Sequence, residues 1–437
     1  MREKADLTKL RKSLRVNNFY TRYGKIEQIV GMTVEASGMS CNIGDVCEIS
    51  IASRDKILSE VVGFKNNKVL LMPYGDIDGI GYGSFVRNTG EKLKIKMSDA
   101  LIGRTIDALG NPIDDKGDIR CDAVYAINGS PANPMARPPI TEPLEFGVKA
   151  IDGLITIGKG QRMGIFAGSG VGKSTLMGMI ARNIKADVNV IALVGERGRE
   201  LLEFINKDLG PEGIKRSVLV VATSDQPAML RSKCAQTATA IAEYFKDQGK
   251  DVLLMMDSLT RFCMAEREIG LSVGEPPVAR GYTPSIYASL PRLLERCGNF
   301  EKGSITGIFT VLVEGDDSNE PISDTVRGII DGHIMLSRKI AMKNHYPAID
   351  VLASISRLMS SIATPEQKKV AGMIRKMMSA YNDNQDLISI GAYKTGTNPE
   401  LDMAITRMDA INAFLQQQVD KSSSMEETIN TMMSIVK

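Results

Sequence analysis

The sequence of 437 residues contains no tryptophan and only two histidines, and its six cysteines are scattered along the chain without a Cys-x-x-Cys pair. Zinc sites need cysteine and histidine at short, repeated spacings, and disulfide-stapled domains need an ordered framework of cysteine pairs. Neither pattern is present. The cysteines are therefore expected to be reduced thiols, as in a cytoplasmic protein.

An excess of charge of one sign is also lacking, since 54 Lys and Arg stand against 52 Asp and Glu, a net charge of +2. This balance gives no global attraction to nucleic acid or to a membrane. Apolar runs such as Val218–Ala222 are far shorter than the ~20 residues of a membrane-spanning helix. The charged N-terminus has no apolar stretch typical of a secretory signal. A hydrophobic content of 43% predicts two or three globular domains.

The first 90 residues divide into two parts of different texture. Residues 1–18 carry six basic and two acidic side chains, and Leu7, Leu10 and Leu14 lie on one face of a predicted helix. This helix either docks into a partner or packs on its own chain. From 19 to 90, short β-type runs separated by glycines and Asn/Asp turns predict a small barrel or sandwich. Seven basic and eight acidic residues leave this part without a basic surface.

The middle of the chain, residues 91–361, is predicted to be an α/β domain. Its entry segment, 131–143, holds five of the 17 prolines and is expected to be extended without regular hydrogen-bonded ladders. Beyond it, apolar strand-like runs alternate with helical patterns, which predicts a mostly parallel sheet covered on both faces. The predicted strands are Met163–Ala167, Val188–Val194, Val218–Thr223, Val252–Met256 and Ile305–Val313.

Helical patterns take over at 362–437. Thr364 followed by Pro365 and Gln367 is typical of a capped helix start, Asn398-Pro399 is a second start, and Ser423 with Glu426 a third. The tail is expected to be a helical domain. Its methionines either fill an adaptable core or form a protein-binding surface; they are Met373, Met377, Met378, Met403 and Met408.

The strongest chemical signal is a glycine-rich loop between a predicted strand and a predicted helix. The strand ends at Ala167, the loop Gly168-Ser169-Gly170-Val171-Gly172 follows, and Lys173-Ser174-Thr175 opens the helix. Backbone amides of such a loop, with the positive end of the helix, bind phosphate. Lys173 is expected to reach the β- and γ-phosphates, and the Ser174 hydroxyl to ligate Mg²⁺. Alanine replaces the usual first glycine, at Ala167, which is tolerable if φ there is negative.

Two carboxylates stand at the ends of other predicted strands. Asp257 ends the strand Val252–Met256, which would place it beside the phosphate loop, where it can hold the metal. Glu196 and Arg197 follow the strand Val188–Val194. Hydrolysis of ATP needs a carboxylate to polarise water and cations to neutralise the γ-phosphate. Residue spacing alone leaves a surface salt bridge as an equal alternative for Glu196 and Arg197.

Several longer motifs of the sequence resemble those of a known protein family. The runs GVKAIDGL (147–154), VGERGREL (194–201), RGYTPS (280–285), EPISDTVRGIIDGH (320–333) and HYPAIDVLASISR (345–357), together with the phosphate loop, resemble the catalytic subunits of rotary ATPases. More closely, from about residue 19 onward, they look like the flagellum-specific ATPases of type III export. The resemblance implies a RecA-like core, an N-terminal β-barrel and a C-terminal helical domain.

The resemblance also implies roles for single residues. Glu196 matches the catalytic glutamate of the family. Arg197 and Arg261 match arginines that approach the γ-phosphate, and Tyr346 matches the aromatic residue that stacks on adenine. Arg357 matches the arginine finger that enters the site of the neighbouring subunit. Such a cation, provided in trans, would couple hydrolysis to ring assembly.

Phe414 and Val419 are further, weaker candidates for the adenine pocket. The function that the resemblance implies is hydrolysis of MgATP by a homohexamer that energises flagellar protein export. The family's partners are a stator-like regulatory protein at the N-terminal helix, a coiled-coil stalk, export chaperones and substrates, and a membrane export gate that the cytoplasmic ring meets peripherally. Three alternatives remain: an injectisome ATPase, a non-catalytic ring subunit and a hexameric RNA translocase. Glu196 argues against the second. The absence of a basic surface at 19–90 argues against the third and against nucleic acid as a partner.

Overall fold

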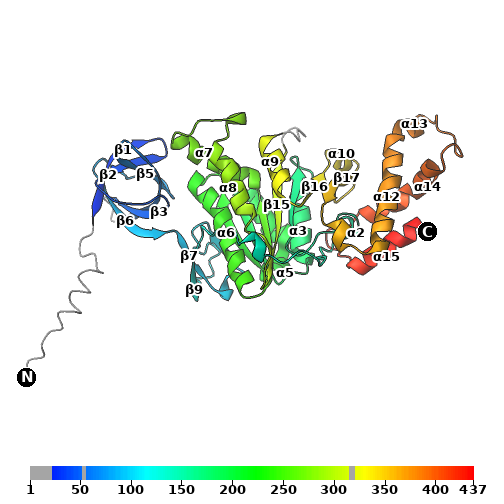
Figure 1. Ribbon diagram of the computed structural model, residues 1–437, viewed down its shortest axis with the longest axis horizontal. Coiled ribbons are helices and arrows are strands. Elements are labelled where there is room, and N and C mark those ends of the chain that lie inside the picture. Colours follow the sequence, from blue (N-terminus) through cyan, green and yellow to red (C-terminus); the bar gives the residue numbers. More distant parts are fainter. Residues whose placement is uncertain (1–21, 52–55, 314–319) are drawn as a thin grey trace, which may run out of the picture. The chain divides into compact units, whose positions relative to one another are not determined.

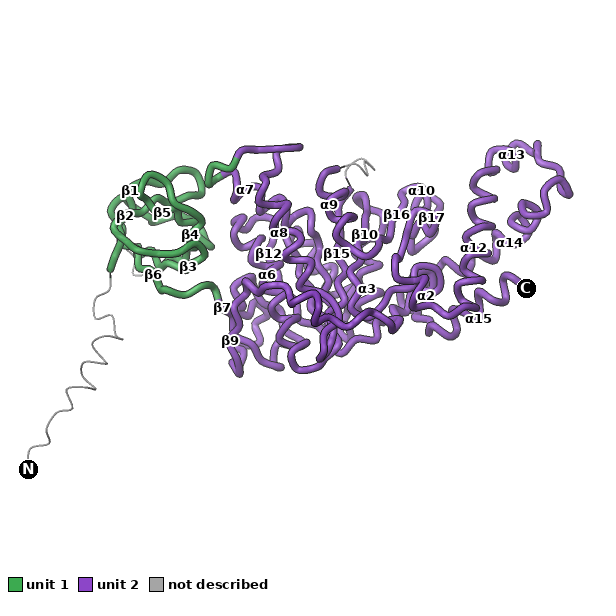
Figure 2. The backbone as a smooth tube through the Cα atoms, in the orientation of Figure 1, with its two compact units in different colours: residues 1–93, 272–275 green, residues 94–271, 276–437 purple. Residues whose placement is uncertain are grey.

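The computed structural model describes residues 22–51, 56–313 and 320–437 (Figure 1). The predicted helix at 1–18 lies outside these residues. The chain divides into two compact units, one of residues 1–93 with 272–275 and one of residues 94–271 with 276–437 (Figure 2). In the described part of the chain, no helix combines the length and the apolar character needed to cross a membrane.

The first unit is a closed six-stranded barrel, so the sandwich alternative is wrong. Strands such as β1 alternate buried and exposed residues at their start, β5 is buried nearly throughout, and Ile26, Ile49 and Leu71, each at most 1% exposed, meet in the core. Closure leaves no unpaired strand edge. The strands, in the order β1-β2-β5-β4-β3-β6, are β1 (Tyr23–Val30), β2 (Thr33–Ser37), β5 (Lys68–Pro73), β4 (Lys56–Lys65), β3 (Asp45–Ser50) and β6 (Phe85–Lys92).

The second unit is built on a mostly parallel sheet, as the alternation of strands and helices predicts. The predicted strands all form, and three strands that the sequence patterns did not indicate extend the sheet, β8 at one end and β16 and β17 at the other. Along the sheet the order is β17 (Ile349–Ser356), β16 (Gly332–Leu336), β10 (Arg162–Ala167), β15 (Ser304–Leu312), β13 (Asp251–Asp257), β11 (Val188–Glu196), β12 (Ser217–Thr223) and β8 (Thr105–Asp107), with β14 (Gly298–Asn299) paired to β15.

Helices cover this sheet on both sides (Figure 1). The long helix α6 (Ala228–Asp247) packs on β11, β12 and β13, and α3 (Lys173–Asn183) begins directly after the glycine loop. The other helices of this part are the 3₁₀ helices η1 (Asp99–Leu101) and η4 (Ala279–Gly281), the π-helix η3 (Phe204–Leu209), and α2 (Lys149–Leu154), α4 (Gly198–Glu203), α5 (Gly210–Lys215), α7 (Leu259–Ser272), α8 (Pro284–Leu294), α9 (Pro321–Ile329), α10 (Arg338–Met342) and α11 (Met359–Ile362).

The proline-rich segment 131–143 has little regular structure, as its prolines predict. It forms one 3₁₀ turn, Pro134–Ala136, and one isolated bridge between Pro143 and Gly158. Arg137 anchors it by donating to the carbonyl of Cys297 at 2.9 Å. Ahead of the segment, β7 (Lys94–Met97) pairs with β9 (Ala123–Ala126).

The chain ends in α12 (Pro365–Asp383), α13 (Gln385–Ser389), α14 (Pro399–Leu415) and α15 (Met425–Val436). Thr364 and Asn398 cap α12 and α14 as predicted. The third predicted start is wrong by one residue, because the capping box is formed by Ser424 with Glu427. The hydroxyl of Ser423 is engaged by the hydroxyl of Thr428 at 3.1 Å instead.

The terminal helices are hydrogen-bonded to α2. Gln367, 2% exposed, donates to the carbonyl of Asp152 at 2.9 Å and to the hydroxyl of Thr156 at 2.8 Å. Arg375 of α12 donates to the carbonyl of Leu154 at 2.8 Å. Most of the expected segment 91–361 therefore shares one compact unit with 362–437, whereas residues 91–93 and 272–275 belong to the barrel unit.

The methionines of the tail divide between the two roles considered for them. Met377 and Met408 are 3% and 8% exposed and belong to or border the core, whereas Met403 is 50% exposed. Core filling accounts for the first two, and Met403 lies on the surface.

Candidate active site

The glycine-rich loop lies where the sequence places it, between the end of β10 and the start of α3. Gly170 and Gly172 have φ of +77° and +90°, a left-handed backbone that glycine adopts without strain. Ala167 is the last residue of β10, where a side chain is accommodated, which explains why alanine replaces glycine there. The loop and the first turn of α3 form an anion-binding cradle.

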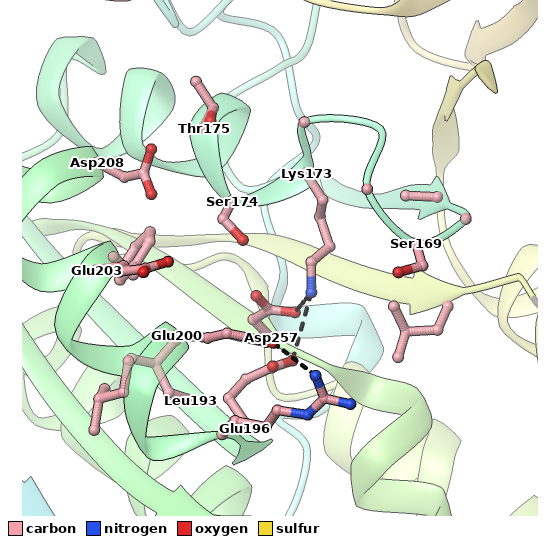
Figure 3. A pocket seen from close by; sticks show the side chains of 18 of the residues that line it. Ser169, Lys173, Ser174, Thr175, Leu193, Glu196, Glu200, Glu203, Asp208 and Asp257 are labelled. Carbon is pink, nitrogen blue, oxygen red and sulfur yellow. Dashed lines mark hydrogen bonds and ion pairs between the residues drawn. The ribbon is translucent and has the colours of Figure 1, made fainter. Parts of the chain in front are cut away.

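The loop opens into a cavity of about 690 Å³ (Figure 3). Most of the predicted site residues line it, whereas Val171 is 2% exposed and packs into the core. Tyr346 and Arg357 are not among the lining residues. The predicted residues that do line it are Gly168, Ser169, Gly170, Gly172, Lys173, Ser174, Thr175, Glu196, Arg197, Asp257 and Arg261.

Lys173 joins the two predicted carboxylates beneath the loop (Figure 3). Its ammonium pairs with Asp257 and lies 3.5 Å from Glu196 Oε1. Burial would lower the pKa of Lys173, but the charges of Asp257 and Glu196 outweigh burial and raise it. The cavity thus holds a largely buried triad of one cation and two anions.

Glu196 ends β11, next to α4. Burial raises the pKa of its carboxyl, and the neighbouring charge of Asp257 adds to this, against the opposing effect of Lys173. A carboxylate whose pKa is moved toward neutrality is suited to accept a proton from water.

Two arginines flank Glu196 in different ways. Arg197 is 74% exposed and pairs with Glu200 at 3.2 Å, so the surface salt bridge considered for Arg197 does form. Exposed pairs of this kind are weak, and this one leaves Arg197 free to re-pair. The side chain of Arg261 packs against Gly195, where an added Cβ would lie 3.1 Å from that of Arg261. Its Nε is buried and has no partner among the described residues. An unsatisfied buried cationic donor in a cavity fits an anionic ligand.

The residues of the cavity also fit a nucleotide-bound cation. Ser174 follows Lys173 on the first turn of α3, and Asp257 ends the buried strand β13 at 3% exposed. A serine hydroxyl and a carboxylate are the oxygen ligands that Mg²⁺ takes when phosphates complete its shell.

Tyr346 lies beside the loop, outside the cavity lining. A Cβ built on Gly172 would be 3.4 Å from its ring, and Tyr346 as a whole is 41% exposed. Gln417 donates its backbone amide to the Tyr346 carbonyl at 3.1 Å, which brings the segment containing Val419 to the same area. Phe414 is 3% exposed in the core, with Lys149 Nζ 5.7 Å from its ring centre, so Phe414 packs the interior.

Arg357 follows β17 and is exposed. Its guanidinium donates to the carbonyl of Arg327 at 3.1 Å and contacts no part of the cavity of its own chain. An arginine that serves a phosphate site from this position would have to serve the site of another subunit.

The structure adds residues that sequence reasoning missed. Glu200, Glu203 and Asp208 line the cavity from α4 and η3, and Thr310 donates to Asp257 from β15. A partial signal existed for Thr310, because it is a polar residue inside the apolar run Ile305–Val313. In the sequence, the acidic residues of α4 and η3 cannot be distinguished from the charged residues of an ordinary solvent-exposed helix.

A glycine loop between a parallel strand and a helix, a lysine at the helix start and an acidic residue ending a nearby strand define a P-loop nucleotide-binding protein. The matching family models are the ATP synthase alpha/beta family β-barrel domain at residues 26–90, the nucleotide-binding domain of the same family at 147–356, and the T3SS EscN ATPase C-terminal domain at 363–434.

Relatives extend over nearly the whole chain. The "Flagellum-specific ATP synthase" of Bacillus subtilis is 54% identical, covering 97% of each chain, and the "Type 3 secretion system ATPase" of Xanthomonas euvesicatoria is 50% identical, covering 95% of this chain and 94% of that one. The assembled ATPase EscN of enteropathogenic E. coli has a TM-score of 0.90 at 46% identity, over 95% of this chain and 100% of that one. The chain belongs to the ATP synthase alpha/beta family, in its branch of flagellar and type III secretion ATPases, and is an ATPase.

Proposed function

We propose that this ATPase energises flagellar type III protein export by hydrolysing MgATP at the interfaces of a homohexameric ring. The observation that carries the proposal is the triad of Lys173, Glu196 and Asp257 beneath the phosphate loop. The flagellar assignment is favoured over the injectisome by the relative at 54% identity. It is also favoured by two short runs, Gly391-Ala-Tyr-Lys394 and Asn344-His-Tyr-Pro347, which resemble the flagellar more than the virulence ATPases.

Each residue of the triad has a role that follows from its place. Lys173 would leave the two carboxylates for the β- and γ-phosphates, which outweigh them in charge. Glu196 would orient water and accept its proton, since its raised pKa favours proton uptake. Arg261 and Arg197 would neutralise the γ-phosphate. Ser174 and Asp257 would hold Mg²⁺, which supplies Lewis-acid polarisation of the phosphate oxygens.

Ring assembly is supported by the position of Arg357. Its exposed guanidinium lies outside the cavity of its own chain, as expected for a finger that completes the site of a neighbour. The EscN structures, one of an assembled ATPase and one in complex with its central stalk EscO, at 46% and 45% identity, support a similar ring around a stalk protein. Tyr346, beside the loop, would stack on adenine.

Further partners belong to the same proposal. These are a stator-like regulatory protein at the N-terminal segment, export chaperones and their substrates, and a membrane export gate reached peripherally from the cytoplasm. Nucleic acid is not among them, because the barrel segment has no basic excess.

Mixed rings test the trans role of Arg357. Arg357→Ala and Lys173→Met are each expected to be inactive, but a mixture that co-assembles should regain part of the activity. Some interfaces then combine an intact loop from one chain with an intact arginine from the other. Co-assembled mixtures that never exceed either parent would refute the trans role.

Turnover against protein concentration tests the ring and its class together. A sigmoidal rise without RNA is expected, because assembly creates the complete sites. An absolute requirement for RNA would replace the export function with that of a hexameric translocase.

A further inference from the structure

Asp257 is held from behind by a threonine on the next strand. Strands β13 and β15 are parallel neighbours in which Met256 pairs with Phe309, so Asp257 and Thr310 follow at the same level. Thr310 Oγ1 donates to Asp257 Oδ1 at 2.6 Å and lies 3.3 Å from the Met256 carbonyl. A hydroxyl has one proton, and the short contact with a charged acceptor is the stronger of the two.

Burial makes this contact hard to replace. Thr310 is 0% exposed and Asp257 is 3% exposed, so water has no access to the back of the carboxylate. The two hydrogen bonds that described residues donate to the Asp257 side chain, from Lys173 and from Thr310, both end on Oδ1. Oδ2 therefore receives none from these residues.

We propose that Thr310 is a positioning residue for Asp257. Its hydroxyl holds Oδ1 and fixes the rotation of the carboxylate, so that Oδ2 stays available to the cation of MgATP when the nucleotide draws Lys173 away. The inference rests on the proposed function, in which Asp257 and Ser174 hold that cation.

The departure of Lys173 is the step at which Thr310 matters. While Lys173 pairs with Asp257, the ammonium also restrains the carboxylate. Once the ammonium turns to phosphate, Thr310 is the remaining described donor to this side chain. Residues that orient a metal ligand in this way typically contribute about 10–100-fold to metal affinity.

Thr306 provides a matched control on the same strand. It lies four residues earlier, hence on the same face of β15, and is 1% exposed. Its hydroxyl accepts from the Gly160 amide at 2.9 Å and contacts no residue of the triad. Thr306→Val thus removes a buried hydroxyl of equal size and depth without touching Asp257.

The test measures how much Mg²⁺ strengthens ADP binding, as the ratio of dissociation constants in excess EDTA and in excess Mg²⁺. Full-length wild type is compared with Thr310→Val, Thr310→Ser, Thr306→Val and Asp257→Asn, each checked by thermal melting. Thr310→Val should reduce the ratio about 10–100-fold. Thr310→Ser, which retains the hydroxyl, and Thr306→Val should both keep the wild-type ratio. If Thr310→Val does not fold, Thr310→Ala takes its place with the same expectation.

The outcomes separate the inference from the function on which it rests. A ratio that falls for Asp257→Asn but not for Thr310→Val would overturn the positioning role and leave the metal role of Asp257 standing. A ratio unchanged in Asp257→Asn would overturn both the metal role of Asp257 and the positioning role of Thr310. An equal fall in Thr310→Val and Thr306→Val would assign the effect to general packing of β15 and overturn the inference.

Discussion

Replacing Lys173 by methionine should destabilise the nucleotide-free protein as well as stop catalysis. The ammonium is the cation that pairs with both Asp257 and Glu196, and the three side chains are 14%, 5% and 14% exposed. Methionine retains an apolar stem of similar length but leaves two buried carboxylates facing each other. Removing one partner of a buried ion pair typically costs about 3–5 kcal/mol.

The size of the effect can be converted to a melting temperature. The unit that contains the triad comprises about 340 residues, and unfolding entropy is roughly 2.1 cal/mol/K per residue. A loss of about 3–5 kcal/mol then corresponds to a drop of roughly 4–7 °C at neutral to mildly basic pH. The assay is differential scanning calorimetry of nucleotide-free wild type and Lys173→Met.

The pH dependence adds an internal check. Burial and the charge of Asp257 raise the pKa of Glu196, and the ammonium of Lys173 opposes this shift. Without the ammonium, native Glu196 binds a proton more readily than Glu196 of the unfolded chain, so the stability of the variant recovers as pH falls. The deficit should therefore be smaller at about pH 5.5 than at about pH 8. Lys185→Met is the control, because Lys185 is 69% exposed and pairs with Glu145, outside the triad. Equal melting temperatures of Lys173→Met and wild type at about pH 8, or an equal drop in Lys185→Met, would refute the reasoning.

Two further predictions concern neighbouring parts of the site. Glu196→Gln should bind ATP normally but turn it over about 10²–10⁴-fold more slowly. In wild type, the raised pKa of Glu196 should place the acid limb of the turnover–pH profile above the usual 4.5 of a glutamate. An acid limb at or below that value, or a variant that loses affinity with unchanged turnover, would contradict the role of Glu196. Gly178→Ala should lower the melting temperature, because the added Cβ would lie 2.4 Å from the carbonyl oxygen of Asp208, and the cost of overpacking, about 1–3 kcal/mol, exceeds the ~1 kcal/mol that alanine gains in helix propensity. Calorimetry of Gly372→Ala, at a helical glycine of α12 with open space around it, measures the gain in propensity alone. A Gly178→Ala protein as stable as wild type would contradict the prediction and show that η3 shifts without cost.

The parts of the site that sequence analysis predicted are those encoded locally. The loop Gly168–Gly172 and Lys173 are contiguous, and Asp257 is readable because a strand ends there. The parts that it missed depend on which strands become neighbours. Thr310 meets Asp257 because β15 lies next to β13, although 53 residues separate them in sequence. Neither propensity nor periodicity encodes strand order.

The same difference between local sequence signals and contacts formed only in the fold explains two smaller errors of the sequence analysis, the start of α15 and the missed strand β16. The shift of the last helix start from Ser423 to Ser424 turns on which hydroxyl Thr428 engages, a contact that two adjacent serines do not reveal in sequence. The strand β16 was missed because its run contains His333 among apolar residues and is short, and its membership in the sheet comes from pairing with β10.

The hydrogen bonds between α12 and the segment Asp152–Thr156 have a mechanical consequence. Gln367 in the first turn of α12 and Arg375 in its middle are both hydrogen-bonded to this segment, whereas the far end of the helix, at Asp383, is 18 residues beyond Pro365. A helix of this length is about 28 Å long. A tilt of about 10° at the clamped end would displace the far end by about 5 Å. A small rotation of this segment would therefore become, at the tip of α12, a displacement larger than the diameter of a water molecule.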